Sequence, residues 1–199
     1  EEQAEIIELV NDAKTEEIAF EISHVVSTGI VLSSGLTTKI VKIINESTLA
    51  SASYVANIAL TNSVLVNPNA LEIMKIIGSS NKKYQAKISS DIAKNLDVLS
   101  NKNILGIIKM ASEIEKESHC DLFVSLAKNR EILRANLTIK LMILASKLDD
   151  EQIKILNIIA SDKLLEKNQR SVYYIIRMLE EPDKIPSIYE QAQTEITLF

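Results

Sequence analysis

Hydrophobic residues recur along this chain in a pattern that repeats every 33 or 34 residues. Each of the first four copies opens with an aliphatic residue, continues with an aliphatic pair, and closes with four apolar residues spaced i, i+1, i+3 and i+4. The opening residues are Val25, Ile58, Ile92, Leu126 and, in a weaker fifth copy, Ile159. The closing quartets of the first four copies begin at Ile40, Ile73, Ile107 and Leu141. A fixed period of this length is typical of repeat proteins, in which each unit buries its apolar face against the next.

Each copy predicts two helices joined by a short connector. The quartet covers one wide helical face, so we expect it to close an amphipathic helix of about three turns. A second helical stretch precedes each opening residue from the second copy on, over 49–60, 82–95, 118–129 and 150–161. The connector carries the aliphatic pair, for example Val64 and Leu65, which we expect to fill the core. The side chains placed to cap the second helices are Asn67, Asn101 and Asn168.

The repeat predicts an all-α fold, an α-solenoid of stacked two-helix units of the HEAT-like kind. A single hairpin cannot bury enough apolar surface to offset its conformational entropy, so the copies must stack. We expect one repeat array over residues 1–199, with five consecutive copies in 25–180 and a divergent C-terminal cap or linker in 181–199. Residues 1–24 match a truncated preceding repeat and a first helix. Because Ile6 and Ile7 already occupy quartet positions, we expect the chain to be a fragment of a larger protein.

Composition supports helices and narrows the functional classes. With 46% hydrophobic residues, four glycines and three prolines, the chain has too few turn residues for an all-β fold. The net charge of −5 opposes non-specific binding to nucleic acid or to an anionic membrane. One cysteine suits a reducing, cytoplasmic compartment, and no apolar stretch approaches the roughly 18 residues of a membrane span. The 18 lysines against four arginines suggest an AT-rich, bacterial genome.

The repeat copies also resemble a known class of proteins. The third and fourth copies read IAKNLDVLSNKNILGII and LAKNREILRANLTIKLM. This phrase before an apolar helix resembles the HEAT-like and leucine-rich-variant α-solenoids of bacteria. The stretches SVLVNPNALEIMKIIGSS and KISSDIAKNLDVL resemble an uncharacterised alphaproteobacterial family of HEAT-like repeat proteins. The likeness covers about residues 25–180, and it implies an architecture without supplying catalytic residues.

Residues that could carry catalysis or bind a metal are few. His24 and His119 are the only histidines, and His119 with Cys120 lacks the further ligands that a metal site needs. We therefore expect His119 on a helix surface and Cys120 buried as a small apolar group. The acidic run 149–151 falls at a helix start, where the helix dipole favours it, and 180–183 reads as a solvated turn. We predict no enzymatic activity, no metal and no cofactor.

Basic residues recur at matching positions of successive second helices. Lys42, Lys75 and Lys109 share one column, Lys39 and Lys140 share a column three residues earlier, and Arg177 lies one residue after the first column. In stacked hairpins such columns form a stripe along one face. One interpretation is a groove for an acidic or phosphate-bearing partner. The other is that the lysine stems cover apolar surface while their charged groups stay in water.

Three functions remain open on the sequence alone. The leading one is a non-enzymatic scaffold or adaptor that binds another protein, possibly through an acidic segment of that partner. The second is a helical-repeat module that binds nucleic acid or a phosphorylated ligand along the lysine stripe. The acidic net charge and the scarcity of arginine and aromatic residues oppose this second function. The third is a regulatory arm of an enzyme that is encoded elsewhere in the full-length chain.

Overall fold

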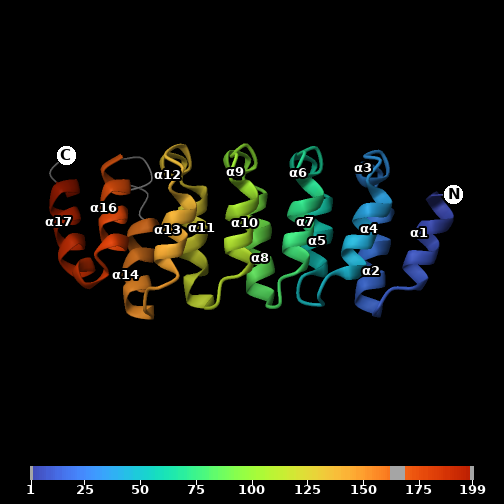
Figure 1. Ribbon diagram of the computed structural model, residues 1–199, viewed down its shortest axis with the longest axis horizontal. Coiled ribbons are helices and arrows are strands. Elements are labelled where there is room, and N and C mark those ends of the chain that lie inside the picture. Colours follow the sequence, from blue (N-terminus) through green and yellow to red (C-terminus); the bar gives the residue numbers. More distant parts are fainter. Residues whose placement is uncertain (1, 162–168, 198–199) are drawn as a thin grey trace. The chain divides into compact units, whose positions relative to one another are not determined.

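The computed structural model describes residues 2–161 and 169–197, and it is helical, with no strand in either range (Figure 1). Contacts within the chain separate two compact units, Glu1–Glu113 and Ile114–Phe199. They are called unit 1 and unit 2 below. The predicted helical stretches 49–60, 82–95, 118–129 and 150–161 are confirmed. An all-α fold therefore follows directly from the hydrophobic pattern.

Unit 1 consists of helix α1 (Glu2–Asn11) followed by three hairpins. Their first helices are α2 (Glu16–Val26), α5 (Ala52–Ala59) and α8 (Lys83–Ala93). Their second helices are α4 (Thr37–Glu46), α7 (Ala70–Gly78) and α10 (Ile104–Ser112). The connectors are one-turn helices, namely α3 (Gly29–Leu32), α6 (Asn62–Leu65) and α9 (Leu96–Leu99). Figure 1 shows these short helices together at one edge of the unit.

The hairpins of unit 1 pack on one another through both of their helices. Helix α4 contacts α7, and α7 contacts α10, while α5 contacts both α2 and α8. The quartet residues form the core, and Ile40, Val41 and Ile44 are all 0% exposed. Complete burial of such a side chain contributes about 1.5–3 kcal/mol. The connector valines Val31, Val64 and Val98 are also fully buried, which confirms that the connector fills the core, although Leu32 of the first pair is 53% exposed.

Hydroxyl groups just before α5 bond the C-terminal end of α7, in the second hairpin of unit 1. The Ser51 hydroxyl donates to the Gly78 carbonyl at 2.7 Å, and the backbone N–H of Thr48 donates to the same oxygen at 3.1 Å. The Thr48 hydroxyl donates to the Ser80 carbonyl at 2.6 Å. These bonds satisfy carbonyls that have no partner within the helix. A Cβ at Gly78 would lie 2.6 Å from Ser47 Oγ, so glycine allows this close approach.

An asparagine joins the second and third hairpins at the opposite edge. Asn67 Nδ2 donates to the carbonyl of Leu99, 32 residues later, at 3.0 Å. Its Oδ1 accepts from the N–H of Asn69 at 2.9 Å. The prediction that Asn67 and Asn101 cap the second helices is wrong, because the cap positions are Asn69 and Asn103. Asn67 and Asn101 instead turn the chain two residues earlier, and Asn168 lies outside the described residues.

Unit 2 begins with a hairpin like those of unit 1, in which a short helix joins two longer ones, and its C-terminal helices differ from that pattern. It starts with η1 (Glu117–His119), α11 (Cys120–Lys128), the short helix α12 (Arg130–Arg134) and α13 (Thr138–Ala145). It continues with α14 (Asp150–Ser161), α16 (Gln169–Glu180), η2 (Pro182–Lys184) and α17 (Ile185–Thr197). Helix α11 packs on α13 and α14, and α17 packs on α14 and α16. The connector of the fifth sequence copy lies in 162–168, outside the described residues.

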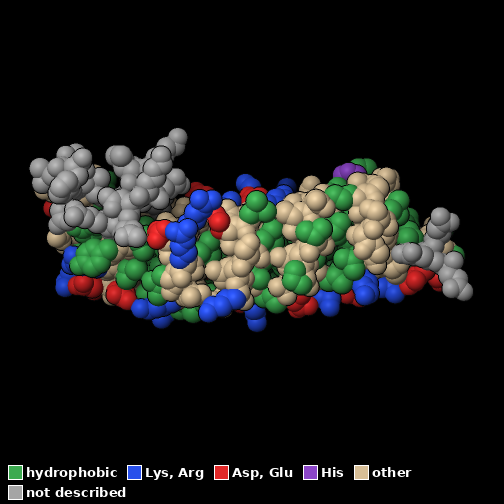
Figure 2. All heavy atoms as spheres, turned by 90° about the horizontal axis from the view of Figure 1, so that it is seen from above, with side chains coloured by type: hydrophobic (Ala, Val, Ile, Leu, Met, Phe, Trp, Pro, Cys, Tyr) green, Lys and Arg blue, Asp and Glu red, His purple; other side chains and the backbone are tan. Residues whose placement is uncertain are grey.

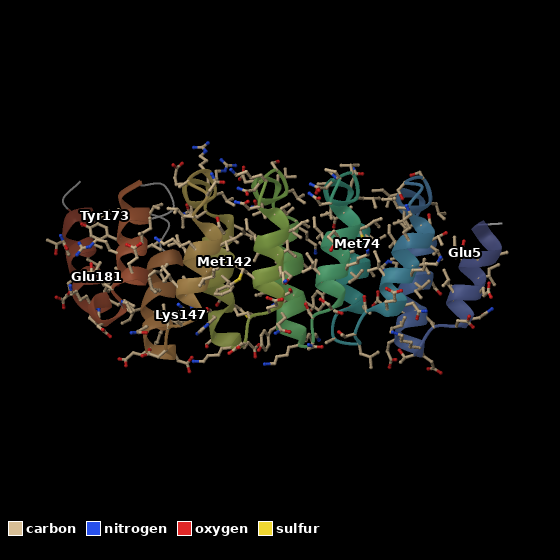
Figure 3. The ribbon with its side chains drawn as sticks, viewed as in Figure 1. Glu5, Met74, Met142, Lys147, Tyr173 and Glu181 are labelled. Carbon is tan, nitrogen blue, oxygen red and sulfur yellow. The ribbon has the colours of Figure 1, made fainter. Side chains whose placement is uncertain are left out.

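Equivalent columns of the repeat occupy equivalent positions in both units. Met74 on α7 and Met142 on α13 share a quartet column, and each is 0% exposed (Figure 3). The acidic run 149–151 begins α14 as predicted. In the C-terminal segment, Pro186 is the second residue of α17, where a helix needs no N–H donor. The assignment of residues 1–199 to a single array, with 181–199 as its cap, stays a prediction.

Candidate partner-binding face

The second helices of unit 1 place three lysines at the same position on neighbouring helices. Each lysine lies inside an apolar quartet, at the one position of the i to i+4 run that faces solvent. The side chains of Lys42, Lys75 and Lys109 are 52%, 59% and 65% exposed. Helix α4 contacts α7 and α7 contacts α10, so the three lysines lie on successive packed helices, and their role as a binding site stays a prediction.

Every lysine of this column has an acidic partner, which the sequence analysis did not anticipate. Lys42 Nζ lies 2.7 Å from Glu5 Oε1. Lys75 Nζ lies 3.8 Å from Glu72 Oε2, and Lys109 Nζ lies 3.9 Å from Glu113 Oε1. In Figure 2, basic and acidic side chains alternate along the lower border of unit 1, at the right of the view. We call the four lysines at 39, 42, 75 and 109 and these three glutamates the charged face of unit 1.

The ion pairs of the charged face are of two kinds. Lys42 reaches from α4 to Glu5 on α1, so this pair also holds two helices together. Lys75 and Lys109 pair only with residues three and four positions away in sequence. Exposed pairs of this local kind stabilise a protein by about 0.3–0.5 kcal/mol. Breaking the pair with Glu72 or Glu113 therefore costs little, whereas breaking the pair with Glu5 also removes a contact between α1 and α4.

Lys39 extends the charged face on α4. Its side chain is exposed, and it forms no hydrogen bond or ion pair with any other residue that the structure describes. It lies one turn before Lys42 on the same helix. Within the charged face, Lys39, Lys75 and Lys109 are accordingly the three lysines whose charges do not join two helices.

The two remaining candidate residues belong to unit 2 and join its helices. Lys140 on α13 lies 2.7 Å from Glu180 on α16. The Arg177 guanidinium donates to Gln191 Oε1 at 3.2 Å, lies 3.8 Å from Glu181, and stands 5.7 Å from the centre of the Tyr173 ring. Its side chain is only 29% exposed. These contacts give both residues a role in packing, and a stripe through all six basic residues stays a prediction.

Among the residues of unit 2 that the structure describes, Glu181 and His119 have shifted pKa values. The hydrogen bond from Lys184 and the charge of that lysine lower the pKa of Glu181. Burial lowers the pKa of His119. The prediction of a surface position for His119 is wrong, because this side chain is 2% exposed. Residues after a loop can be buried by an element far along the chain, which local periodicity does not reveal. Cys120 is buried as predicted.

Neither a metal centre nor a membrane span is found in the ranges that the structure describes. Within 2–161 and 169–197, no three His, Cys, Asp or Glu residues are grouped to hold a metal ion. No helix in those ranges combines the length and the apolar character needed to cross a membrane.

The acidic partners of two lysines could have been found in the sequence. Glu72 precedes Lys75 by three residues, and Glu113 follows Lys109 by four, which are the spacings that bring side chains together on a helix. Glu5 carries no such signal, because it lies 37 residues from Lys42.

Comparison with models of protein families, with curated proteins and with solved structures found no match to this chain. The family resemblance of the repeat copies therefore stays a prediction.

Proposed function

We propose that this chain is a non-enzymatic binding protein of the HEAT-like α-solenoid type, and that the charged face of unit 1 binds a segment of another protein. The observation that carries the proposal is the lysine column, which recurs on three second helices and remains mostly exposed. A charge at this position does not contribute to the hydrophobic core. The recurrence of lysine there therefore favours a role at the protein surface.

The order of helices in unit 1 supports the architectural part of the proposal. Long helix, one-turn helix and long helix follow one another in each of the three hairpins. Each hairpin contacts the next through both of its long helices. Stacking of this kind, with a period of 33 or 34 residues in the sequence, is how solenoid proteins build an extended surface.

The spacing of the column favours a partner with regularly placed acidic residues. Packed helices lie about 8–10 Å apart, so the lysines recur at about that step. Seven residues of an α-helix advance about 10.5 Å and return to nearly the same side. Three residues of a polyproline II segment advance about 9 Å with the same result. A partner segment of either kind, with acids at that period, places one carboxylate opposite each lysine.

The glutamates on the same face favour a mixed-charge protein segment over a nucleic acid. A phosphate backbone carries an uninterrupted row of negative charges and binds where positive charge is uncompensated. Glu5, Glu72 and Glu113 lie within 4 Å of the lysines and would repel such a ligand. A protein segment can place acidic residues opposite the lysines and basic or polar residues opposite the glutamates.

Two matched charge-reversal variants test the proposal. The face variant carries Lys39→Glu, Lys75→Glu and Lys109→Glu. The control variant carries Lys83→Glu, Lys87→Glu and Lys94→Glu, three exposed lysines on α8 or at its end. Both variants change the net charge equally and lie in unit 1. Lys42 is left intact because it holds α1 to α4.

The measurement is the affinity of a partner recovered by cross-linking to the intact wild-type chain. We expect the face variant to bind it at least about tenfold more weakly, a loss of about 1.4 kcal/mol, while the control variant binds like the wild type. Equal affinities for all three proteins contradict the proposal. An oligonucleotide shifted at low salt by the wild type and not by the face variant would favour the nucleic-acid function instead.

A further inference from the structure

His119 is the one histidine that the fold buries, and it lies at the start of unit 2. It ends the short helix η1 and is 2% exposed, whereas His24 on α2 is exposed. The His119 ring is hydrogen-bonded to the backbone of Leu148, in the connection between α13 and α14. Its Nε2 atom is buried without a hydrogen-bond partner. By elimination, the Leu148 carbonyl accepts from Nδ1–H, and Nε2 carries the lone pair of a neutral imidazole.

The surroundings of the ring suit the neutral form only. Protonation would add an N–H and a positive charge at Nε2, where no acceptor is available. The charged groups that act on the ring are Lys116, which opposes protonation, and Asp150 on α14, which favours it. Asp150 already accepts from Ser118 Oγ at 2.9 Å and lies 3.9 Å from Lys116. Glu117 of η1 and Asp121 of α11 are exposed to solvent.

We propose that His119 is an acid-sensitive latch, which holds η1 against the start of α14 while its ring is neutral and releases this contact when the ring is protonated. The latch joins elements that lie close together in unit 2, because η1 contacts both α11 and α14. Release removes the hydrogen bond to Leu148 and exposes the ring to water. The proposal concerns unit 2 alone and does not depend on partner binding at the charged face.

The direction of the pH dependence follows from where the proton binds. In the closed form, burial lowers the pKa of His119 below its usual 6.5. In the open form the ring regains that usual value, so the open form takes up a proton first as the pH falls. The equilibrium constant for opening therefore rises by at most about tenfold for each pH unit below 6.5, and it levels off once the closed form also protonates. Above 6.5 the latch is insensitive to pH.

Titration of the two histidine rings by proton NMR on the intact chain tests the latch directly. The signals are assigned with a His24→Gln variant. We expect the pKa of His119 to lie below the 6.5 that is usual for histidine. A His119 pKa at or above 6.5 overturns the proposal. This measurement needs no variant at position 119, so it stands even where such a variant does not fold.

Urea unfolding of His119→Gln provides the second test. Glutamine can still donate a hydrogen bond to Leu148 but cannot be protonated. We expect the wild type and His24→Gln to unfold at lower urea when the pH drops from about 7.5 to about 5.5, and His119→Gln to lose most of that change. An equal shift in all three proteins assigns the acid sensitivity to other groups and overturns the latch.

Discussion

The hairpins of unit 1 and the helices of unit 2 are joined by different kinds of polar contact. In unit 1, the Ser51 hydroxyl bonds the Gly78 carbonyl within the second hairpin, and the Asn67 amide reaches from the second hairpin to the Leu99 carbonyl of the third. In unit 2, Gln152 and His119 also bond backbone carbonyls, but further contacts join two side chains of which at least one is charged. The pairs Ser118 with Asp150, Lys140 with Glu180 and Arg177 with Gln191 are of this kind.

This difference predicts how the stability of each unit depends on pH and on salt concentration. A hydrogen bond from a hydroxyl or an amide to a carbonyl neither titrates near neutral pH nor is screened by salt. Contacts that involve Asp150 or Lys140 depend on ionic strength, and His119 adds a dependence on pH. We therefore expect the contacts made by Ser51 and Asn67 in unit 1 to resist changes of pH and salt that weaken those of unit 2, whereas the pair of Lys42 with Glu5 is screened by salt.

The largest expected effect concerns the hydrophobic core, to which the same repeat column contributes in each unit. Met74→Ala and Met142→Ala each remove a fully buried side chain from the same repeat column. We expect each to lower the free energy of unfolding of its own unit by about 2–5 kcal/mol, as measured by urea unfolding with circular dichroism. The matched controls, Met74→Leu and Met142→Leu, should cost less than about 1.5 kcal/mol. A loss below about 1 kcal/mol for either alanine variant contradicts a common core position.

The next effect tests the close approach of Gly78 on α7 to Ser47, which follows α4. Gly78→Ala normally stabilises a helix by about 1 kcal/mol, but here the new Cβ meets Ser47 Oγ at 2.6 Å. That hydroxyl donates to the Ile43 carbonyl at 2.7 Å, so Gly78→Ala should destabilise the protein by about 1–3 kcal/mol.

A double-mutant cycle provides the control for this prediction. In a Ser47→Ala background the clash disappears, and Gly78→Ala should become neutral or stabilising. Thermal unfolding of the four proteins measures the sign change. If Gly78→Ala has the same effect in both backgrounds, the close approach of α7 to Ser47 is not present in solution.

A smaller effect is expected from the Ser51 hydroxyl. Ser51→Ala removes the 2.7 Å bond to Gly78, whose carbonyl keeps the Thr48 N–H as a donor. We expect a loss of about 0.5–1.5 kcal/mol that is the same at about pH 5.5 and pH 7.5, because neither group titrates there. A larger loss of stability at the lower pH would contradict the expectation that this contact of unit 1 does not depend on pH.

The smallest effects come from exposed lysines, and they differ with the kind of pair. Lys140→Met breaks the pair between α13 and α16, and we expect a loss of about 0.2–1 kcal/mol at low salt. Lys75→Met removes only a local pair and should cost no more than about 0.5 kcal/mol. Both losses should fade in about 1 M salt, where the screening length is about 3 Å. Urea unfolding at the two salt concentrations checks this, and a loss at Lys140 that persists in high salt contradicts an electrostatic origin.

Sequence periodicity was enough to predict the helices and the core columns, because burial follows helical spacing within one element. The quartet that begins at Ile40 and the connector residue Val64 illustrate this. Contacts between residues about 32 positions apart could not be predicted in the same way. Asn67 was interpreted as a helix cap, and its bond to Leu99 depends on how the next hairpin packs.

The candidate site was predicted in part. The column of Lys42, Lys75 and Lys109 could be read from the repeat alone, since equivalent positions on equivalent helices face solvent alike. The pairing of Lys42 with Glu5 could not, because it depends on the side-chain conformations of two packed helices. His119 was misplaced for a related reason, since the connection at Leu148 that covers it lies 29 residues away.

Hydrogen exchange of the intact chain, followed by mass spectrometry at about pH 7.5 and pH 5.5, tests the contrast between the units most directly. After correction for the intrinsic exchange rates, we expect protection of α4, α5 and α7 to be unchanged. Protection of η1, α11 and α14 should fall by up to about tenfold at the lower pH, the limit for one proton over the unit below 6.5. An equal fall in both units, or none in unit 2, would contradict the account.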